Sequence, residues 1–525
     1  MPQAKSQEVR FPTLNLQPFK IDYLSFNHFI RRAACRLLVV MAPGIFRPSL
    51  DLEAVARLAR DLRKRPCSCD SSQTPLSGSF NWVFIISFDD GVKWIFRTPR
   101  KESFGTRLPE ELVPDLIASE VATMKYVSQH STIPVPIVYD YSCTTSNDVG
   151  VPYILMSQAK GTSLASWSWL NGPHQLQMNN NRETISLKAQ EKVMAELGKI
   201  SSQLLRLQFD QIGSLFEEDG HFVTKHSLNP AFYFQDRHSL SQIKRGPFPN
   251  DEIFYRSLLD TFLVHVQDLD MSHHCFRAPV PTESEFDNPE TYRRATDLWN
   301  DFVTIGLKID SGENRFDYLA AGKAVEDIIP SLATTNHPEV TECFGSGFAI
   351  SHPDLSINNI FVDEDFNITC IIDWSFASTV PIPQLLVTPG MPHPRDQPSA
   401  SATASFRTSF MDHIGVTSGA RSVLWSLAET IWHFIRWVNM DSLVASPLKH
   451  IRNLQQRSDM EQVRMELVLE DLSPEQIKKE ERKYFSAVTD GWRRYKTAKK
   501  LTDQFRQSDE LVISASVWSS PEWAC

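Results

Sequence analysis

The stretch of the chain that decides the fold covers residues 351–378 and reads SHPDLSINNIFVDEDFNITCIIDWSFAS. Two short apolar runs, residues 360–362 and 368–372, flank the turn-forming letters DEDFN, so the pattern predicts a β-hairpin. Asn359 stands just before the first run, and Asp373 stands just after the second. The hairpin would therefore bring these two polar side chains together at one of its ends.

The residue types at that end suit phosphoryl transfer. An amide oxygen and a carboxylate are hard ligands of the kind that Mg²⁺ prefers. Asp354, on the irregular loop before Asn359, can face the same point and orient an attacking hydroxyl. The alternative is that these residues are ordinary turn formers, and for any one of them alone that interpretation would be preferred. His352, Asp354, Asn359 and Asp373 at this spacing favour a functional site.

The N-terminal half contains a second predicted hairpin. Residues 82–88 and 92–97 are strand-like, and Asp89-Asp90-Gly91 between them is a strong turn signal. Residues 114–127 follow with helical periodicity, and Glu120 lies on the apolar face of that helix. A carboxylate there either pairs with a cation or lies exposed at the edge of the apolar stripe.

These motifs resemble the aminoglycoside phosphotransferase family, whose kinase-like fold also includes choline and homoserine kinases. The family pattern is H-x-D, four residues, N, and then a strand hairpin that ends in I-D-W or I-D-x. His352, Asp354, Asn359 and residues 372–374 fit it position by position. The resemblance implies that Asp354 is the catalytic base, that His352 braces its loop, and that Asn359 and Asp373 bind magnesium.

The resemblance also assigns the phosphate-binding residues of the nucleotide site. Gly78, Ser79 and Asn81 would belong to the loop that covers the phosphates, although a single glycine there is a weak signal. Arg97 would hold the α- and β-phosphates and pair with Glu120. Lysine usually occupies that position; an arginine is bulkier, and its planar guanidinium directs its N–H donors differently from a lysine ammonium.

Lys93 is a second candidate for that cation. It lies on the same face of the strand as Arg97, because alternate residues of a strand point the same way.

The adenine would be bound by the connector between the lobes. Residues 155–161, LMSQAKG, are similar to the L-M-S-E-A-D-G hinge of aminoglycoside kinases. By that match the Ser157 carbonyl and the Ala159 amide would hydrogen-bond the adenine edge. Gly161 would let the chain turn into the helical lobe.

The predicted fold class is α+β, a bilobal protein-kinase-like fold with a small antiparallel-sheet lobe and a large, mostly helical lobe. The chain of 525 residues divides into segments with different expected roles. These are an N-terminal arm with helices packing on the small lobe (1–75), the nucleotide-binding lobe (76–156), the helical lobe (157–503) with catalytic loop 351–378 and exposed loop 389–405, and a C-terminal tail (504–525).

Composition narrows the range of partners and locations. With 53 basic and 63 acidic residues the formal charge is −10, which argues against a nucleic-acid or anionic-membrane surface as the main partner. The chain has no apolar run of about 18 residues, the length of a membrane-spanning helix. Eight cysteines are too sparse for a disulfide scaffold. With no hydrophobic signal region among the first residues, we expect a cytoplasmic protein with reduced thiols and no obligate protein partner.

The function that the sequence favours is an ATP- and Mg²⁺-dependent kinase acting on a hydroxyl of a small molecule. The alternative is a non-catalytic, nucleotide-binding scaffold, suggested by the single-glycine loop and by Arg97. A protein kinase is a third interpretation, disfavoured because no Ala-Pro-Glu sequence follows the I-D-W motif. The acceptor is not determined: the helix with Trp425, Trp432 and Trp437 could line its site, but such a helix is more often core.

Overall fold

The computed structural model describes residues 50–439, except for 71–74, 78–79, 101–108, 170–181, 270–288, 290–311, 395–397 and 415–417. The predicted N-terminal arm before residue 50 and the predicted tail, 504–525, lie outside these ranges. None of the described helices has both the length and the apolar character needed to cross a membrane.

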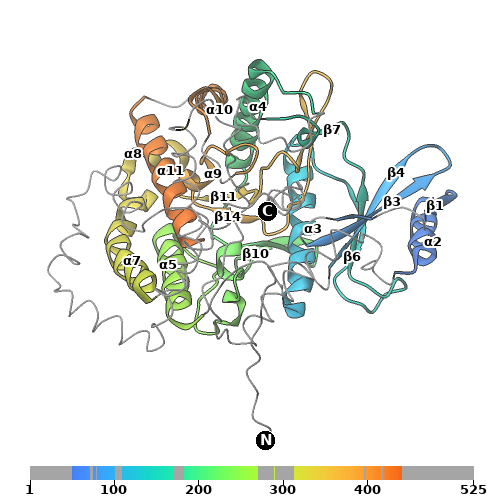
Figure 1. Ribbon diagram of the computed structural model, residues 1–525, viewed down its shortest axis with the longest axis horizontal. Coiled ribbons are helices and arrows are strands. Elements are labelled where there is room, and N and C mark those ends of the chain that lie inside the picture. The colour runs from blue at the N-terminus through green and yellow to red at the C-terminus, as the bar shows by residue number, and fades with distance from the viewer. Residues whose placement is uncertain are drawn as a thin grey trace, which may run out of the picture.

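The chain forms two lobes, a small one built on a sheet and a large helical one (Figure 1). The sheet has six strands, all antiparallel, in the order β1-β3-β4-β6-β5, with β2 paired to β3. The predicted α+β bilobal class is therefore confirmed. The elements of the small lobe are α2 (Leu52–Arg63), β1 (Cys67–Cys69), β2 (Leu76–Ser77), β3 (Asn81–Phe88), β4 (Lys93–Pro99), η1 (Glu110–Leu112), α3 (Val113–His130), β5 (Val138–Ser142) and β6 (Tyr153–Ser157).

The predicted hairpin of the small lobe is the pair β3 and β4. Gly91 in its turn has φ +82°, a left-handed conformation that glycine adopts at no steric cost. Asp90 of the same turn accepts two hydrogen bonds from Arg63 at the end of α2, at 2.8 and 2.9 Å. This bidentate pair ties α2 to the tip of the hairpin.

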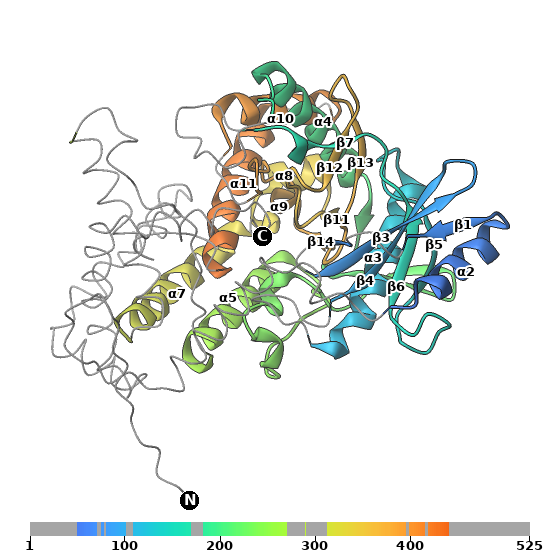
Figure 2. The same cartoon turned by 45° about the vertical axis from the view of Figure 1, so that its right-hand side comes forward.

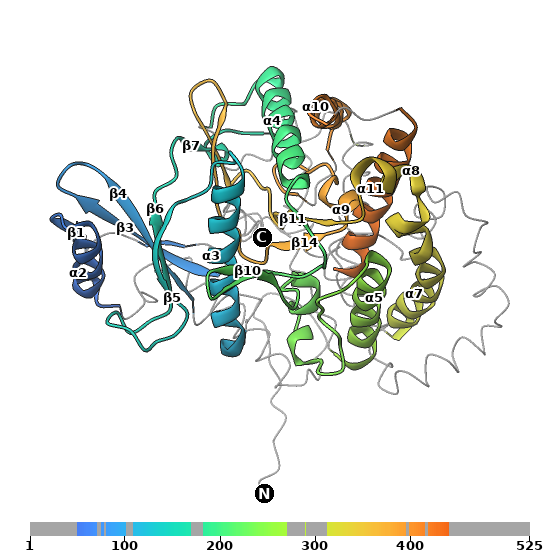
Figure 3. The same ribbon diagram turned by 180° about the vertical axis from the view of Figure 1, so that it is seen from behind.

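Helix α3 joins the two lobes. Ile117 and Val121 on its buried face share a core with Ile154 of the small-lobe sheet and with Ile371 and Trp374 of the large lobe. Seen from behind, the helix stands between the sheet and the helical lobe (Figure 3). Any group on α3 is thus held relative to both lobes.

The large lobe is mostly helical, with short sheets at the junction with the small lobe (Figure 2). Its helices are α4 (Leu187–Leu205), α5 (Asp251–Asp268), α7 (Gly312–Leu332), α8 (Pro338–Phe344), α9 (Ile382–Leu385), α10 (Ala400–Asp412) and α11 (Ser418–Val438), with 3₁₀ turns η2 (Leu164–Ser166), η3 (Pro230–Phe232), η4 (Arg237–Ser239) and η6 (Thr334–Asn336). Its strands are β7 (Thr162–Ser163), β8 (Gln208–Phe209), β9 (Leu215–Glu218), β10 (His221–Thr224), β11 (Phe348–Ser351), β12 (Ile360–Val362), β13 (Ile368–Ile371) and β14 (Ser378–Val380).

The expectation of an exposed loop over residues 389–405 is wrong for much of that segment. Met391 is buried, and helix α10 begins at Ala400, where the Ser399 side chain accepts the N-terminal cap hydrogen bond from Ala402 N. Phe406, one and a half turns further, is completely buried against α4. The Pro- and Ser-rich composition suggested a loop, but tertiary packing of the helix face that follows outweighs it. The other predicted domain boundaries stay predictions.

Gly161, predicted to turn the chain into the helical lobe, has φ +86°, and a Cβ there would overlap the Val362 carbonyl. We expect Gly161→Ala to lower the free energy of unfolding by about 2–4 kcal/mol, from left-handed strain plus overpacking. Gly150 is the matched control, because it has φ +76° and open space around its Cβ position. Gly150→Ala should cost only about 1–2 kcal/mol of strain. Urea denaturation measures both, and equal losses would contradict the steric argument.

Candidate active site

The hairpin predicted from the sequence is the pair β12 and β13. Ile360 pairs with Ile371, and the Ile372 amide donates to the Asn359 carbonyl at 2.9 Å. The two polar residues that flank the strands, Asn359 and Asp373, therefore lie at the same end of the hairpin. Asp373 has φ +63°, a strained conformation that a tight turn at a functional site commonly holds.

Asp354 and Asn359 contact each other directly. The Asn359 Nδ2 group donates to both the main-chain oxygen and the Oδ2 atom of Asp354, each at 2.9 Å. These two bonds set the orientation of the amide, because Nδ2 must face Asp354. The Asn359 Oδ1 atom is then the amide's acceptor on the other side, which is the atom a cation needs.

His352 connects the loop that carries Asp354 with the end of the β12–β13 hairpin. Its Nε2–H donates to the Ile372 carbonyl at 2.9 Å, and its Nδ1 accepts from the Asp354 amide at 3.1 Å. Burial lowers the pKa of His352 to about 4, opposed by the hydrogen bond to Ile372 and by the charge of Asp373. The imidazole is thus neutral and cannot donate from both nitrogens. Its position suits the predicted role of a brace for the loop.

This neutral state has a consequence for stability. The pKa of His352 is about 4 in the folded chain against 6.5 for an ordinary histidine, so the unfolded chain binds more protons between these values. We expect the contribution, about 3 kcal/mol, to be complete above pH ~6.5 and to be lost as the pH falls toward 4. Urea denaturation from pH 7.5 to 4.5 measures it, and the slope should flatten in His352→Gln. An equal slope in both proteins would contradict the assignment.

Arg97, the predicted phosphate-side cation, lies on β4. Its Nη2 group pairs with Oε2 of Glu120 on α3, and its Nη1 group lies 3.3 Å from Oδ1 of Asp373. The side chains of Arg97 and Glu120 are 8% and 2% exposed, whereas that of Asp373 is 39% exposed. Strand β4, helix α3 and the end of β13 thus converge through one guanidinium. The apolar-face carboxylate singled out in the sequence is paired and not at an exposed edge.

The charges of this group shift one another's ionisation. Burial raises the pKa of Glu120, and Asp373 adds to the rise, while Arg97 and Ser375 oppose it. Burial alone would lower the pKa of Arg97, but the carboxylates of Glu120 and Asp373 outweigh that effect and raise it. Arg97 therefore keeps its charge in the interior.

Not every predicted residue reaches this group. Lys93 begins β4 and is exposed, so the structure brings Arg97 and not Lys93 to Glu120. Gly78 and Ser79 lie outside the described residues, and Asn81 begins β3 opposite Pro99.

At the hinge, Ser157 ends β6, where its amide donates to the Ile137 carbonyl and its hydroxyl accepts from the Ile137 amide. Ala159, two residues further along the connector, is partly buried. Contact of Ser157 and Ala159 with adenine stays a prediction.

Sequence reasoning missed Ser375. Its hydroxyl donates to Glu120 Oε2 at 2.6 Å, across 255 positions of the chain. The signal that could have found it is its place two residues after Asp373, in the turn that follows the hairpin. Trp374 between them is completely buried, and its Nε1 donates to the Ile371 carbonyl at 3.0 Å. The buried indole anchors the turn that presents Asp373 and Ser375.

The donor set fits a hard divalent cation. Asn359 supplies an oriented amide oxygen, and Asp373 supplies a carboxylate that is partly open to solvent. Among the described residues, no group of three or more His, Cys, Asp or Glu side chains is arranged to hold a metal ion. The predicted pair of ligands is therefore small, as in sites where the phosphates of the nucleotide complete the shell.

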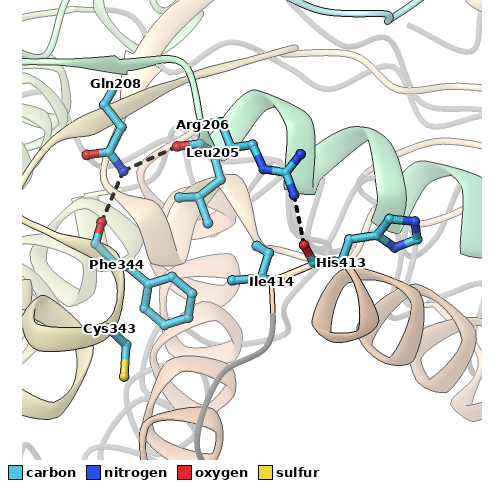
Figure 4. Close-up of a pocket in the computed structure, with 7 residues that line it drawn as sticks. All are labelled: Leu205, Arg206, Gln208, Cys343, Phe344, His413 and Ile414. Carbon is cyan, nitrogen blue, oxygen red and sulfur yellow. Dashed lines mark hydrogen bonds between the residues drawn. The ribbon is translucent and has the colours of Figure 1, made fainter.

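A separate cavity of about 360 Å³ lies in the large lobe, lined by Leu205, Arg206, Gln208, Cys343, Phe344, His413 and Ile414 (Figure 4). The polar groups drawn there bind main-chain oxygens: Arg206 donates to His413 O, and Gln208 donates to Leu205 O and Phe344 O. None of its lining residues belongs to the predicted site.

No family model matches the chain. A subtelomeric hrmA-associated cluster protein of Aspergillus fumigatus is 30% identical over 181 residues, which cover 32% of this chain and 31% of that protein. Altered inheritance of mitochondria protein 9, mitochondrial, of Meyerozyma guilliermondii is 28% identical over 166 residues, 31% of this chain and 24% of that protein. The chain thus spans less than a third of the length of these curated relatives.

Two solved structures that resemble the chain are small-molecule kinases by name. Macrolide 2'-phosphotransferase MphH of Brachybacterium faecium has 12% identity and a TM-score of 0.33, covering 79% of this chain and 100% of that one. Plasmodium vivax ethanolamine kinase has 11% identity and a TM-score of 0.36, covering 82% and 94%. The two lobes and the buried Arg97–Glu120 pair fit the bilobal kinase-like fold that the sequence predicted.

Proposed function

We propose that this protein is an ATP- and Mg²⁺-dependent phosphotransferase that acts on a hydroxyl group of a small molecule. The observation that supports this most strongly is the contact of Arg97 with both Glu120 and Asp373. It joins the sheet lobe, the connecting helix and the catalytic hairpin at one point. A charged group buried between two lobes is costly to maintain for structure alone, since apolar packing is often as stable.

The roles follow from position and charge. Asp354 is held by His352 and Asn359, so its carboxylate is in place to orient the acceptor hydroxyl and to take its proton. Arg97 uses two of its five N–H donors on Glu120 and Asp373, which leaves others for phosphate oxygens. Positioning and charge neutralisation carry most of the rate enhancement in such reactions.

Magnesium would be held by Asn359 and Asp373, where it would neutralise the phosphates and align the γ-phosphate with the acceptor. The protein's own charge makes this cation necessary. Arg97 is already balanced by Glu120, so Asp373 and Asp354 leave the site net negative. We infer that nucleotide phosphates approach it only together with a divalent cation.

The test is a thermal-shift titration with ATP. We expect ATP to raise the melting temperature when Mg²⁺ is present and to have little effect in EDTA, because the uncompensated carboxylates repel the phosphates. The control is Asp373→Asn, in which the Mg²⁺ requirement should weaken together with binding. Equal stabilisation by ATP with and without the cation would contradict the proposed metal site.

Catalysis is tested by ATP consumption with a panel of amino alcohols, aminoglycosides, sugars and hydroxylated metabolites. Turnover that depends on one acceptor class supports the phosphotransferase and names its substrate. Stabilisation by MgATP with no turnover across the panel would instead favour the nucleotide-binding scaffold.

A further inference from the structure

Ser375 occupies a position from which it can control the phosphate-binding cation. Its hydroxyl donates to Glu120 Oε2, the same atom that pairs with Arg97. That carboxylate is 2% exposed, so water cannot replace a lost partner. A hydrogen bond to a buried charged group is among the stronger ones in proteins.

The turn that carries Ser375 is clamped on both sides. On one side Trp374 is completely buried and packs edge-on against His352, with ring centroids 4.7 Å apart. On the other side Phe376, at φ +64°, packs edge-on against Phe234, with ring centroids 5.1 Å apart. A bulky residue in the left-handed region is held there only by its surroundings. The hydroxyl between these rings therefore has little freedom to move away from Glu120.

The same turn also contacts the loop in front of β3. Phe80 belongs to the predicted phosphate-covering loop, and its ring centroid is 5.8 Å from Phe376 and 5.5 Å from Phe234. Residues 373–376 thus bind the small lobe twice, through Ser375 to α3 and through Phe376 to the β3 loop. Asp373, the predicted metal ligand, is part of this four-residue connection.

We propose that Ser375 is a positioning residue that holds Glu120 in register with Arg97 and thereby sets the affinity of the site for MgATP. Without the hydroxyl, Glu120 retains one partner and can rotate, and the guanidinium follows it away from the phosphates. This inference deepens the proposed function and rests on it. It assigns Ser375 no contact with the acceptor.

The experiment compares Ser375→Ala, Ser375→Thr and the control Ser378→Ala. Ser378 is a buried serine three residues further along the same segment. We expect Ser375→Ala to raise Kd and KM for MgATP about tenfold with a smaller change in kcat, the size expected for one hydrogen bond to a charged group. Ser375→Thr, which keeps a hydroxyl, should restore most of the affinity, and Ser378→Ala should bind as the unchanged protein does. Unchanged affinity in Ser375→Ala, or an equal loss in Ser375→Thr, would overturn the proposal.

A second measurement needs no nucleotide. In the unchanged protein, Ser375→Ala should lower the urea concentration at the midpoint of unfolding. In a Glu120→Ala background it should have no further effect, because the hydroxyl has already lost its acceptor. Additive losses would overturn the proposal. Failure of the proposed function has a different signature, because the unchanged protein would then neither bind MgATP nor transfer phosphate, while the unfolding cycle would still report on Ser375.

Discussion

Asp354→Asn is expected to lower kcat by about 10²–10⁴-fold, the usual contribution of a general base. The amide removes the charge and the basicity but keeps an oxygen acceptor. The hydrogen bond from Asn359 Nδ2, 2.9 Å long in the structure, can therefore persist. The loop braced by His352 should keep its shape, and Kd for MgATP should change little. Steady-state kinetics with the acceptor found in the panel, together with a nucleotide titration, measure both quantities.

The matched control is Asp365→Asn. This substitution makes the same chemical change as Asp354→Asn, but on the exposed turn between β12 and β13. It should leave kcat unchanged, because its carboxylate lies at the far end of the hairpin from Asp373. Full activity of Asp354→Asn would show that another group accepts the proton and that the assigned base is wrong.

Arg97→Met is expected to affect both stability and nucleotide binding. Methionine fills a similar volume but leaves the buried carboxylate of Glu120 without its cation. Breaking a buried ion pair by removing one partner typically costs about 3–5 kcal/mol. The free energy of unfolding should fall by that amount, and stabilisation by MgATP should disappear. Urea denaturation and the thermal-shift titration check the two effects separately.

Two further variants make this prediction specific. Lys93→Met on the same strand removes an exposed cation and should leave both quantities near those of the unchanged protein. Glu120→Gln combined with Arg97→Met should recover part of the stability, because a neutral amide costs less to bury than an unpaired charge. If Lys93→Met abolished MgATP binding while Arg97→Met did not, the assignment of the cation would be reversed.

Much of the small lobe could be predicted from local patterns. The Asp-Asp-Gly turn and the alternating strands on either side determined the β3–β4 hairpin, and the apolar spacing around Glu120 determined α3. These elements follow from interactions between near neighbours in sequence. The prediction of an exposed loop over residues 389–405 was wrong because it used local composition alone. Helix α10 depends on packing against α4, about 200 positions earlier in the chain.

The candidate site also contains residues that local spacing predicts and residues whose partners only tertiary packing decides. The spacing of His352, Asp354, Asn359 and Asp373 in one segment predicted that they lie close together, because a hairpin brings its own ends together. The resemblance favoured Arg97 over Lys93, but the strand pattern did not separate the two residues. Both residues lie on one face of a strand, and only the approach of α3 shows which of them meets a carboxylate.

The sequence by itself determined the hairpins, the helix with a buried carboxylate and the residue types for phosphoryl transfer, all of which depend on periodicity and short-range turns. Only the tertiary structure decided that Arg97 spans 276 positions to reach Asp373, and that Ser375 reaches Glu120 from the opposite lobe. Contacts of that range arise when the apolar faces of α3, β6 and the β12–β13 hairpin are buried in one core. Hydrophobic burial is non-directional, so the polar pairs that it brings together leave no signal in the amino-acid sequence.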